Sequence, residues 1–181
     1  MKNILPLFAL VLFAACGQTE PADSLAIQKE NTAMFRTLES DMLASPQISV
    51  ADVAAAKEQG VTLIVNNRPD GEDPSAPQSA EIEAAAKAAG IDYVSIPVTH
   101  AGFSRPQIDT LVAALDKVKA AGGKTLGYCR SGTRSTLLWA LAQASKGESP
   151  RVIAAKAADA GYDVAPIELM LQTLAGAAKD E

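Results

Sequence analysis

Cysteine, histidine and excess positive charge are all scarce in this 181-residue chain. Two cysteines are too few for a fold held together by several disulfides. Sixteen lysines and arginines against 21 aspartates and glutamates give a net charge of −5, so the chain lacks the basic excess typical of nucleic-acid and anionic-membrane binders. The 48% of hydrophobic residues excludes a disordered chain. We therefore expect one folded domain and no nucleic-acid partner.

A short apolar segment lies near the beginning of the chain. It runs from Ile4 to Ala15, too short for a bilayer, which needs about 20 residues, but long enough for the core of a signal peptide. We expect a signal peptide over residues 1–15 and a tether over residues 16–33. The stretch Leu12-Phe13-Ala14-Ala15-Cys16 resembles the lipobox of bacterial lipoproteins. This implies acylation of Cys16 and a place on the periplasmic face of a bacterial membrane, contacted only through the lipid; a soluble periplasmic or secreted protein is the alternative.

Strand and helix patterns alternate through residues 34–181, the expected catalytic domain. The predicted strands are 61–65, 93–98 and 124–128, and the predicted helices are 49–60, 79–89, 104–121, 136–144, 150–160 and 166–177. This alternation predicts an α/β fold with a mostly parallel central sheet flanked by helices. Ligands of such sheets bind at the carboxyl ends of the strands, which makes residues 66–70, 99–102 and 129–135 the candidate sites.

The loop after the third predicted strand contains a candidate nucleophile. Cys129 stands at the strand end, Gly132 allows a tight turn, and Arg134 offers a bidentate fork to a tetrahedral anion. Backbone N–H groups and the helix N-terminus favour negative charge there, so we predict a thiolate in an anion cradle. Ser135 is expected to hydrogen-bond the thiolate or a leaving group. The residues expected to bind the anion are Arg68, Arg130, Ser131, Gly132, Thr133 and Arg134.

The loop Cys129-Arg130-Ser131-Gly132-Thr133-Arg134-Ser135 resembles the active loop of single-domain rhodaneses, which are sulfurtransferases that carry a persulfide on this cysteine. Together with Asn67-Arg68-Pro69-Asp70-Gly71-Glu72 and Ile96-Pro97-Val98, it resembles the phosphatase-like domain of beta-lactamase-hydrolase-like proteins over roughly residues 34–148. That resemblance implies a dual-specificity-phosphatase-like fold. The family is described both as phosphatase-like and as a sulfur transferase, so the resemblance leaves both activities open.

Loop length separates the two activities. Protein tyrosine phosphatases place their arginine six positions after the cysteine, whereas Arg134 stands five positions after Cys129 and Ser135 occupies the sixth. The shorter loop predicts a tighter cradle, better suited to a persulfide or a small sulfur oxyanion than to a phosphate ester.

The general acid is the second discriminator. Phosphatases of this fold protonate the leaving oxygen with an aspartate from an adjacent loop, but residues 99–103 contain no carboxylate. His100, the only histidine of the chain, and Asp70 or Glu72 are the candidate acids. Alternatively, His100 is a surface residue, and Arg68 pairs with Asp70 to brace its loop.

We therefore predict a cysteine-dependent enzyme that transfers sulfane sulfur from a small sulfur anion, through a persulfide on Cys129, to a thiol or cyanide acceptor. The alternative is a phosphatase, a hydrolase that forms a phosphocysteine intermediate on a phosphate substrate. A further alternative is a non-catalytic lipoprotein that binds an anion in the same cradle. We expect no cofactor and no metal in any of these cases.

Overall fold

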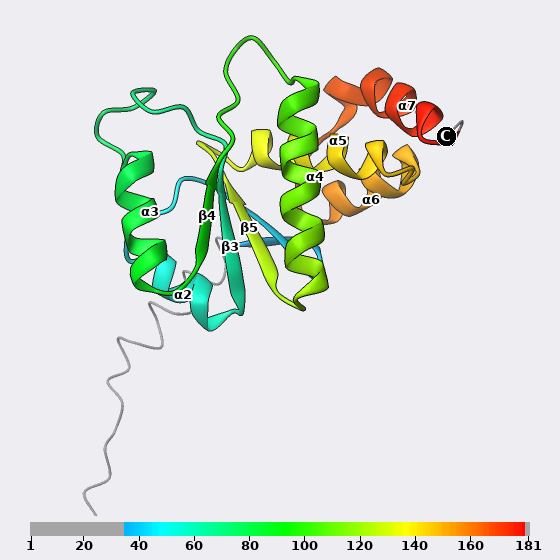
Figure 1. Ribbon diagram of the computed structural model, residues 1–181. Coiled ribbons are helices and arrows are strands. Elements are labelled where there is room, and N and C mark those ends of the chain that lie inside the picture. The colour runs from blue at the N-terminus through cyan, green and yellow to red at the C-terminus, as the bar shows by residue number, and fades with distance from the viewer. Residues whose placement is uncertain (1–34, 180–181) are drawn as a thin grey trace, which may run out of the picture.

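The computed structural model describes residues 35–179, which form a five-stranded sheet with helices on both faces (Figure 1). The strands are β1 (Arg36–Glu39), β2 (Met42–Ser45), β3 (Val61–Asn66), β4 (Asp92–Ser95) and β5 (Lys124–Tyr128). Their order is β1-β2-β5-β3-β4; β1 is antiparallel to β2, and all other pairs are parallel. The predicted α/β class with a mostly parallel sheet is confirmed. The predicted leader and tether, including Cys16, lie outside the described residues.

Six helices are described, and each corresponds to a predicted one. They are α2 (Asp52–Glu58), α3 (Ser79–Ala88), α4 (Arg105–Ala120), α5 (Thr133–Ser145), α6 (Pro150–Asp159) and α7 (Glu168–Ala177), the last preceded by a 3-10 turn at Ala165–Ile167. The main difference is the start of α5, three residues before the predicted one. Gly132 adopts a φ of +88° immediately before the helix, and its carbonyl accepts a 3.0 Å hydrogen bond from the N–H of Thr136. The helix therefore begins directly after the predicted cradle.

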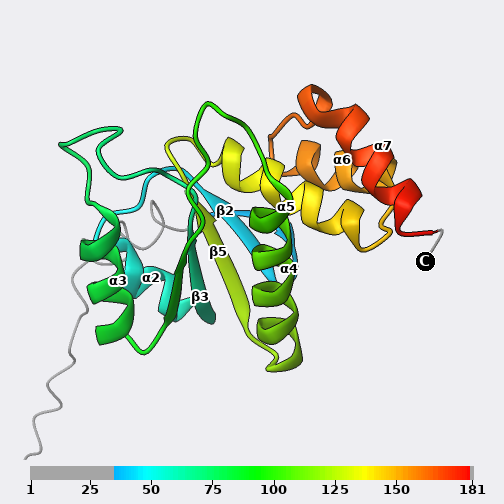
Figure 2. The ribbon, with the colours of Figure 1, turned by 45° about the horizontal axis from the view of Figure 1, so that its top comes forward.

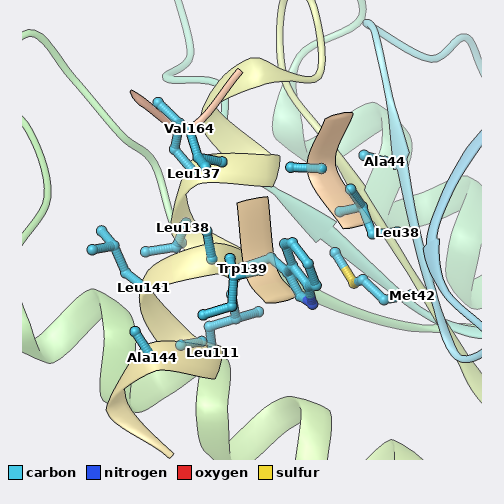
Figure 3. Packing of buried hydrophobic residues seen from close by; sticks show 14 of the residues in the cluster. Leu38, Met42, Ala44, Leu111, Leu137, Leu138, Trp139, Leu141, Ala144 and Val164 are labelled. Atoms are coloured by element: carbon cyan, nitrogen blue, oxygen red, sulfur yellow. The ribbon is translucent and has the colours of Figure 1, made fainter. Parts of the chain in front are cut away.

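The helices divide between the two faces of the sheet. Figures 1 and 2 show α2 and α3 on one face and α4 and α5 on the other, with α6 and α7 packed outside α5. The side chains of α5 are buried nearly all round, as its apolar sequence predicts, because the helix lies between the sheet and three other helices. Figure 3 shows the indole of Trp139 extending from α5 toward Met42 of β2. Leu138 and Trp139 are both fully buried in this cluster.

The loops that follow β3, β4 and β5 meet at one edge of the sheet, at the top of Figure 2. Buried Asn67 links them, because its N–H donates to the carbonyl of Tyr128 at 2.8 Å and its Nδ2 donates to the carbonyl of Ile96 at 2.9 Å. The N–H of Val98 in turn donates to the carbonyl of Asn67 at 3.1 Å. One side chain and its peptide groups thus hold together the three strand ends that the sequence marks as candidate sites.

Within residues 35–179, no helix has both the length and the apolar character needed to cross a bilayer.

Truncating Leu138 to alanine tests the central role of α5. Leu138 is fully buried between the sheet and the outer helices, so Leu138→Ala should lower the free energy of unfolding by about 2–5 kcal/mol. The matched control is Val152→Ala, because 41% of Val152 is exposed and little packing is lost there. Chemical denaturation of the variants measures both values. A loss at Leu138 no larger than that at Val152 would contradict the packing described.

Candidate active site

Cys129 lies immediately after β5, beneath the turn that leads into α5. The residue is fully buried, and its Sγ accepts a 3.2 Å hydrogen bond from the N–H of Gly132. The left-handed backbone at Gly132 then turns the chain into α5 directly after this N–H. Arg130 and Ser131 at the tip of the turn are exposed. The structure thus confirms that Gly132 forms the tight turn, and it places the sulfur under the turn rather than at the surface.

Arg134 projects from the first turn of α5 and is held on one side. Its Nη1 donates to Glu72 Oε2 at 2.7 Å and to the carbonyl of Val98 at 2.9 Å, and its Nη2 donates to Glu72 Oε1 at 2.9 Å. These bonds use three of the five N–H groups of the guanidinium. The Nε–H and one Nη2–H have no oxygen partner among the described residues. The free edge of the fork has the geometry that binds a tetrahedral anion through two N–H groups.

The electrostatics of Arg134 connect it to the cysteine. Burial disfavours the charged guanidinium, but the hydrogen bonds that Arg134 donates to Glu72 and the neighbouring Cys129 outweigh this effect and raise the pKa of Arg134. Arg134 is therefore a permanent cation beside the sulfur. A thiolate at Cys129 and an anion bound above it would both be stabilised by this charge.

Glu72 is the acidic partner of two arginines. Its Oε1 also accepts a 2.9 Å bond from Arg68 Nε. The hydrogen bond from Arg134, with that from Arg68, lowers the pKa of Glu72 below its usual 4.5 despite the opposing effect of burial. Glu72 is consequently a carboxylate at neutral pH, which excludes it as the general acid that the sequence offered as one option. Its role in the structure is to orient Arg134.

Arg68 has a different place from the one predicted. Only 8% of its side chain is exposed, and besides Glu72 it donates to Gln47 Oε1 at 2.9 Å and to Asp73 Oδ2 at 3.4 Å. The prediction that Arg68 binds the substrate anion is corrected, because all three guanidinium nitrogens are occupied by acceptors inside the protein. The predicted brace exists, but its partners are Glu72 and Asp73 rather than Asp70.

A cleft of about 540 Å³ opens beside Arg134. It is lined by Pro69, Asp70, Gly71, Glu72, Thr99, His100, Arg130, Ser131 and Arg134. Asp70 and His100 are exposed there, and Asp70 is fixed by a 2.8 Å hydrogen bond from the N–H of Ser79 at the start of α3. The structure therefore brings together residues from all three predicted strand ends, including both remaining candidate acids.

Two of the predicted site residues carry hydroxyl groups, Ser135 and Thr133, and both contact other parts of the protein. Ser135 is buried against β5, where a Cβ added at Gly127 would lie 3.2 Å from the Ser135 Cβ, and its Oγ makes no hydrogen bond to Cys129. The early start of α5 turns this side chain toward the sheet, so the predicted bond to the thiolate is absent from the described site. Thr133 is exposed and accepts a 3.1 Å hydrogen bond from Ser131 Oγ. It belongs to the surface of the turn.

Tyr162 is the site residue that the sequence did not reveal. It follows α6, and its hydroxyl lies against Gly132. A Cβ added at Gly132 would be only 2.0 Å from Tyr162 Oη. No local pattern marks it, because it lies 33 residues beyond the cysteine.

Among residues 35–179, no group of three or more histidine, cysteine, aspartate or glutamate side chains is arranged to hold a metal ion.

Sequence comparison identifies related proteins. Residues 34–146 match the family described as the phosphatase-like domain of beta-lactamase hydrolase-like protein. A beta-lactamase hydrolase-like protein of Agrobacterium fabrum is 36% identical over 105 residues, which make up 58% of this chain and 24% of that protein. The chain thus spans about a quarter of the length of this relative.

Solved structures share the fold. A Neisseria meningitidis protein, nma1982, described as a candidate phosphatase, matches with a TM-score of 0.67 and 28% identity over 77% of this chain and 96% of its own. Human DUSP28 matches with a TM-score of 0.61 and 19% identity over 81% of this chain and 95% of its own. This second likeness concerns the fold alone and confirms the predicted dual-specificity-phosphatase-like architecture. None of these descriptions names a sulfurtransferase, so they support the phosphatase alternative better than sulfur transfer.

Replacing Glu72 with glutamine should weaken the fold in a pH-dependent way. The pKa of Glu72 is lowered by folding, so its stabilising effect is present above its unfolded pKa and disappears as the pH falls through the lower folded value. We expect Glu72→Gln to reduce the free energy of unfolding at pH 7 by about 1–3 kcal/mol, and the difference from wild type to shrink below about pH 4. Denaturation at several pH values measures it. The exposed pair Arg105–Asp109 supplies the control, because Asp109→Asn should change stability by less than about 0.5 kcal/mol.

Alanine substitutions at two glycines test the contact behind the turn. Gly132 and Gly102 have the same φ of +88°, so both substitutions place a side chain on a left-handed backbone. Only at Gly132 does the new Cβ meet another group, since Gly102 has nothing within 4 Å. Gly132→Ala should therefore be about 1–3 kcal/mol more destabilising than Gly102→Ala in thermal or chemical unfolding. Equal losses would show that Tyr162 does not press on the turn.

Proposed function

The chain belongs to the family of the phosphatase-like domain of beta-lactamase hydrolase-like proteins, and from this premise we propose that it is a cysteine-dependent phosphatase. The observation that carries the proposal is the free Nε and Nη2 edge of Arg134, a residue that lies next to Cys129 and lines the cleft. This edge matches two oxygens of a phosphate group.

The proposed reaction has two displacement steps. The Cys129 thiolate attacks phosphorus, an S–P bond forms, and the P–O bond to the leaving group breaks. Arg134 and the N–H groups of the turn stabilise the charge on the transferred phosphoryl oxygens. Water then attacks phosphorus, the S–P bond breaks, and inorganic phosphate and the thiolate are released. Because Cys129 is fully buried, the turn above it must shift before a substrate reaches the sulfur.

Asp70 and His100 are the proposed proton donors for the leaving oxygen. Both are exposed at the cleft, on loops that follow β3 and β4, and Glu72 is unsuited because its lowered pKa keeps it ionised. A leaving alkoxide needs this proton, whereas a leaving nitrophenolate needs it much less. Substrates of both kinds therefore reveal whether either side chain acts as the acid.

Sulfur transfer is the second candidate, and the spacing of the loop favours it. Arg134 stands five positions after Cys129, one fewer than in protein tyrosine phosphatases, which favours a smaller group on the sulfur. In this reaction the thiolate attacks the outer sulfur of thiosulfate, the S–S bond breaks, and sulfite leaves. The persulfide on Cys129 then passes its outer sulfur to cyanide or to a thiol. Sulfite leaves without protonation, so this reaction needs no general acid.

One set of assays separates the two candidates. Hydrolysis of p-nitrophenyl phosphate and transfer of sulfur from thiosulfate to cyanide are measured on the wild type, Cys129→Ser and Arg134→Lys. We expect the phosphate reaction to be lost in Cys129→Ser and to fall about 10²–10³-fold in Arg134→Lys, because lysine cannot supply two N–H groups in one plane. Cys16→Ser is the matched control and should leave the rate unchanged.

The outcome in the wild type decides between the candidates. Sulfur transfer that depends on Cys129, without phosphate hydrolysis, would overturn the phosphatase proposal and support the second candidate. Activity that survives in Cys129→Ser would overturn both. Absence of both reactions, with phosphate raising the melting temperature, would instead favour an anion-binding lipoprotein.

Export to the periplasmic side of a bacterial membrane stays part of the proposal. It is supported by the apolar segment and the lipobox-like stretch at Cys16, both of which lie outside the described residues. A lipid at Cys16 would tether the catalytic cleft near a membrane surface and would bring membrane-bound phosphate esters within its reach.

A further inference from the structure

Arg36 contacts Tyr162 at the back of the Cys129 turn. The guanidinium of Arg36, from β1, lies over the tyrosine ring, 5.1 Å from its centroid. The same guanidinium donates from Nη1 to the carbonyl of Ala160, at the end of α6, at 3.3 Å. The first strand and the segment after α6 therefore share one anchor. This anchor sets the direction in which the tyrosine ring points.

The ring directs its hydroxyl at Gly132. Tyr162 is 9% exposed, and its Oη has no hydrogen-bond partner among the described residues. The position that a Gly132 Cβ would take lies 2.0 Å from this oxygen, so the hydroxyl lies against the Cα of Gly132. The N–H of the same glycine donates to Cys129 Sγ at 3.2 Å. Gly132 thus stands between Tyr162 and the sulfur.

A buried hydroxyl without a partner needs an explanation. It costs about 1–3 kcal/mol relative to one that is hydrogen-bonded, and phenylalanine would fill the same space without this cost. Burial raises the pKa of Tyr162, Arg36 lowers it, and negative charge at Cys129 raises it, so the hydroxyl keeps its proton at neutral pH. The group is therefore a neutral hydroxyl that is packed against Gly132 without an acceptor among the described residues.

We propose that Tyr162 is a positioning residue for Cys129: its hydroxyl, packed against the Cα of Gly132, holds the N–H of that glycine on the sulfur, and this N–H favours the thiolate over the thiol. The proposal rests on the nucleophilic role of Cys129 in the proposed function. The other charged groups near the sulfur are Arg134 of α5, with Glu72 paired to it from the loop after β3, and exposed Arg130, which follows Cys129 in the turn. These remain in place when the tyrosine hydroxyl is removed.

The test is the reactivity of Cys129 in Tyr162→Phe. Full-length wild type and variant are treated with iodoacetamide between about pH 5 and pH 9, and mass spectrometry of the Cys129 peptide counts this cysteine separately from Cys16. We expect the midpoint of the pH profile to rise and alkylation at neutral pH to fall about threefold to tenfold. The melting temperature should stay the same or rise, because an unpartnered buried hydroxyl is lost.

Two further variants make the result specific. Tyr93→Phe also removes a tyrosine hydroxyl, but one that bonds Ser79 Oγ at 2.9 Å on the other face of the sheet, so it should leave the Cys129 profile unchanged. Arg36→Lys keeps the charge but removes the guanidinium that lies over the ring. Arg36→Lys should shift the profile in the same direction as Tyr162→Phe, by a smaller factor. It replaces Tyr162→Phe as the test if that variant folds poorly.

An unchanged profile in Tyr162→Phe would overturn the proposal, whether or not the melting temperature falls. The measurement needs no turnover. Failure of the wild type to hydrolyse phosphate esters would therefore count against the proposed function alone, while the alkylation profile would still decide the role of Tyr162.

Discussion

The bidentate pair between Glu72 and Arg134 is the interaction on which the candidate site depends. It joins the loop after β3 to the first turn of α5, at 2.7 and 2.9 Å, and it leaves one edge of the guanidinium facing the sulfur. Arg68 supports the same carboxylate from below. A freely rotating arginine would lose side-chain entropy on binding an anion, whereas this one is already oriented. The acidic partner therefore lowers the entropic cost of binding rather than competing for the substrate.

Local pairing also changes the long-range electrostatics. The chain has a net charge of −5, and both Arg68 and Arg134 are matched by carboxylates. Neither of these two arginines therefore adds much positive potential in the solvent to attract a distant anion. Affinity must come from short hydrogen bonds made inside the cleft. Such a site would favour small anions that fit the N–H groups over large polyanions, and its rate of association would depend only weakly on salt.

Much of the fold and the nucleophilic turn was predictable because both leave local signals. The alternation of apolar runs and capped helices predicted the parallel sheet, and Gly132 between Cys129 and Arg134 predicted the turn. The strands β1 and β2 were not predicted, since four residues each are too few to show a period.

Tertiary contacts account for most of what the sequence did not predict about the site. Arg68 has carboxylates at several nearby positions, and spacing does not say that the fold of the loop selects Glu72 and Asp73 over Asp70. Ser135 faces the sheet because α5 begins at Thr133. Tyr162 reaches the turn only because α6 and β1 pack together. When the role of a residue depends on contacts between segments far apart in the chain, no local sequence pattern predicts that role.

The packing of α6 and α7 shows that both helices belong to the same folding unit as the sheet and α5. The stretch shared with the family stops at residue 146, but Ile153, Ala157, Leu171 and Ala175 belong to the same hydrophobic cluster as Leu138 and Trp139. A fragment cut at the edge of the shared stretch would uncover the apolar side of α5 and present it to water. The recognisable portion of the sequence is thus smaller than the cooperative folding unit, and any transplant of this module into another protein would have to carry both terminal helices with it.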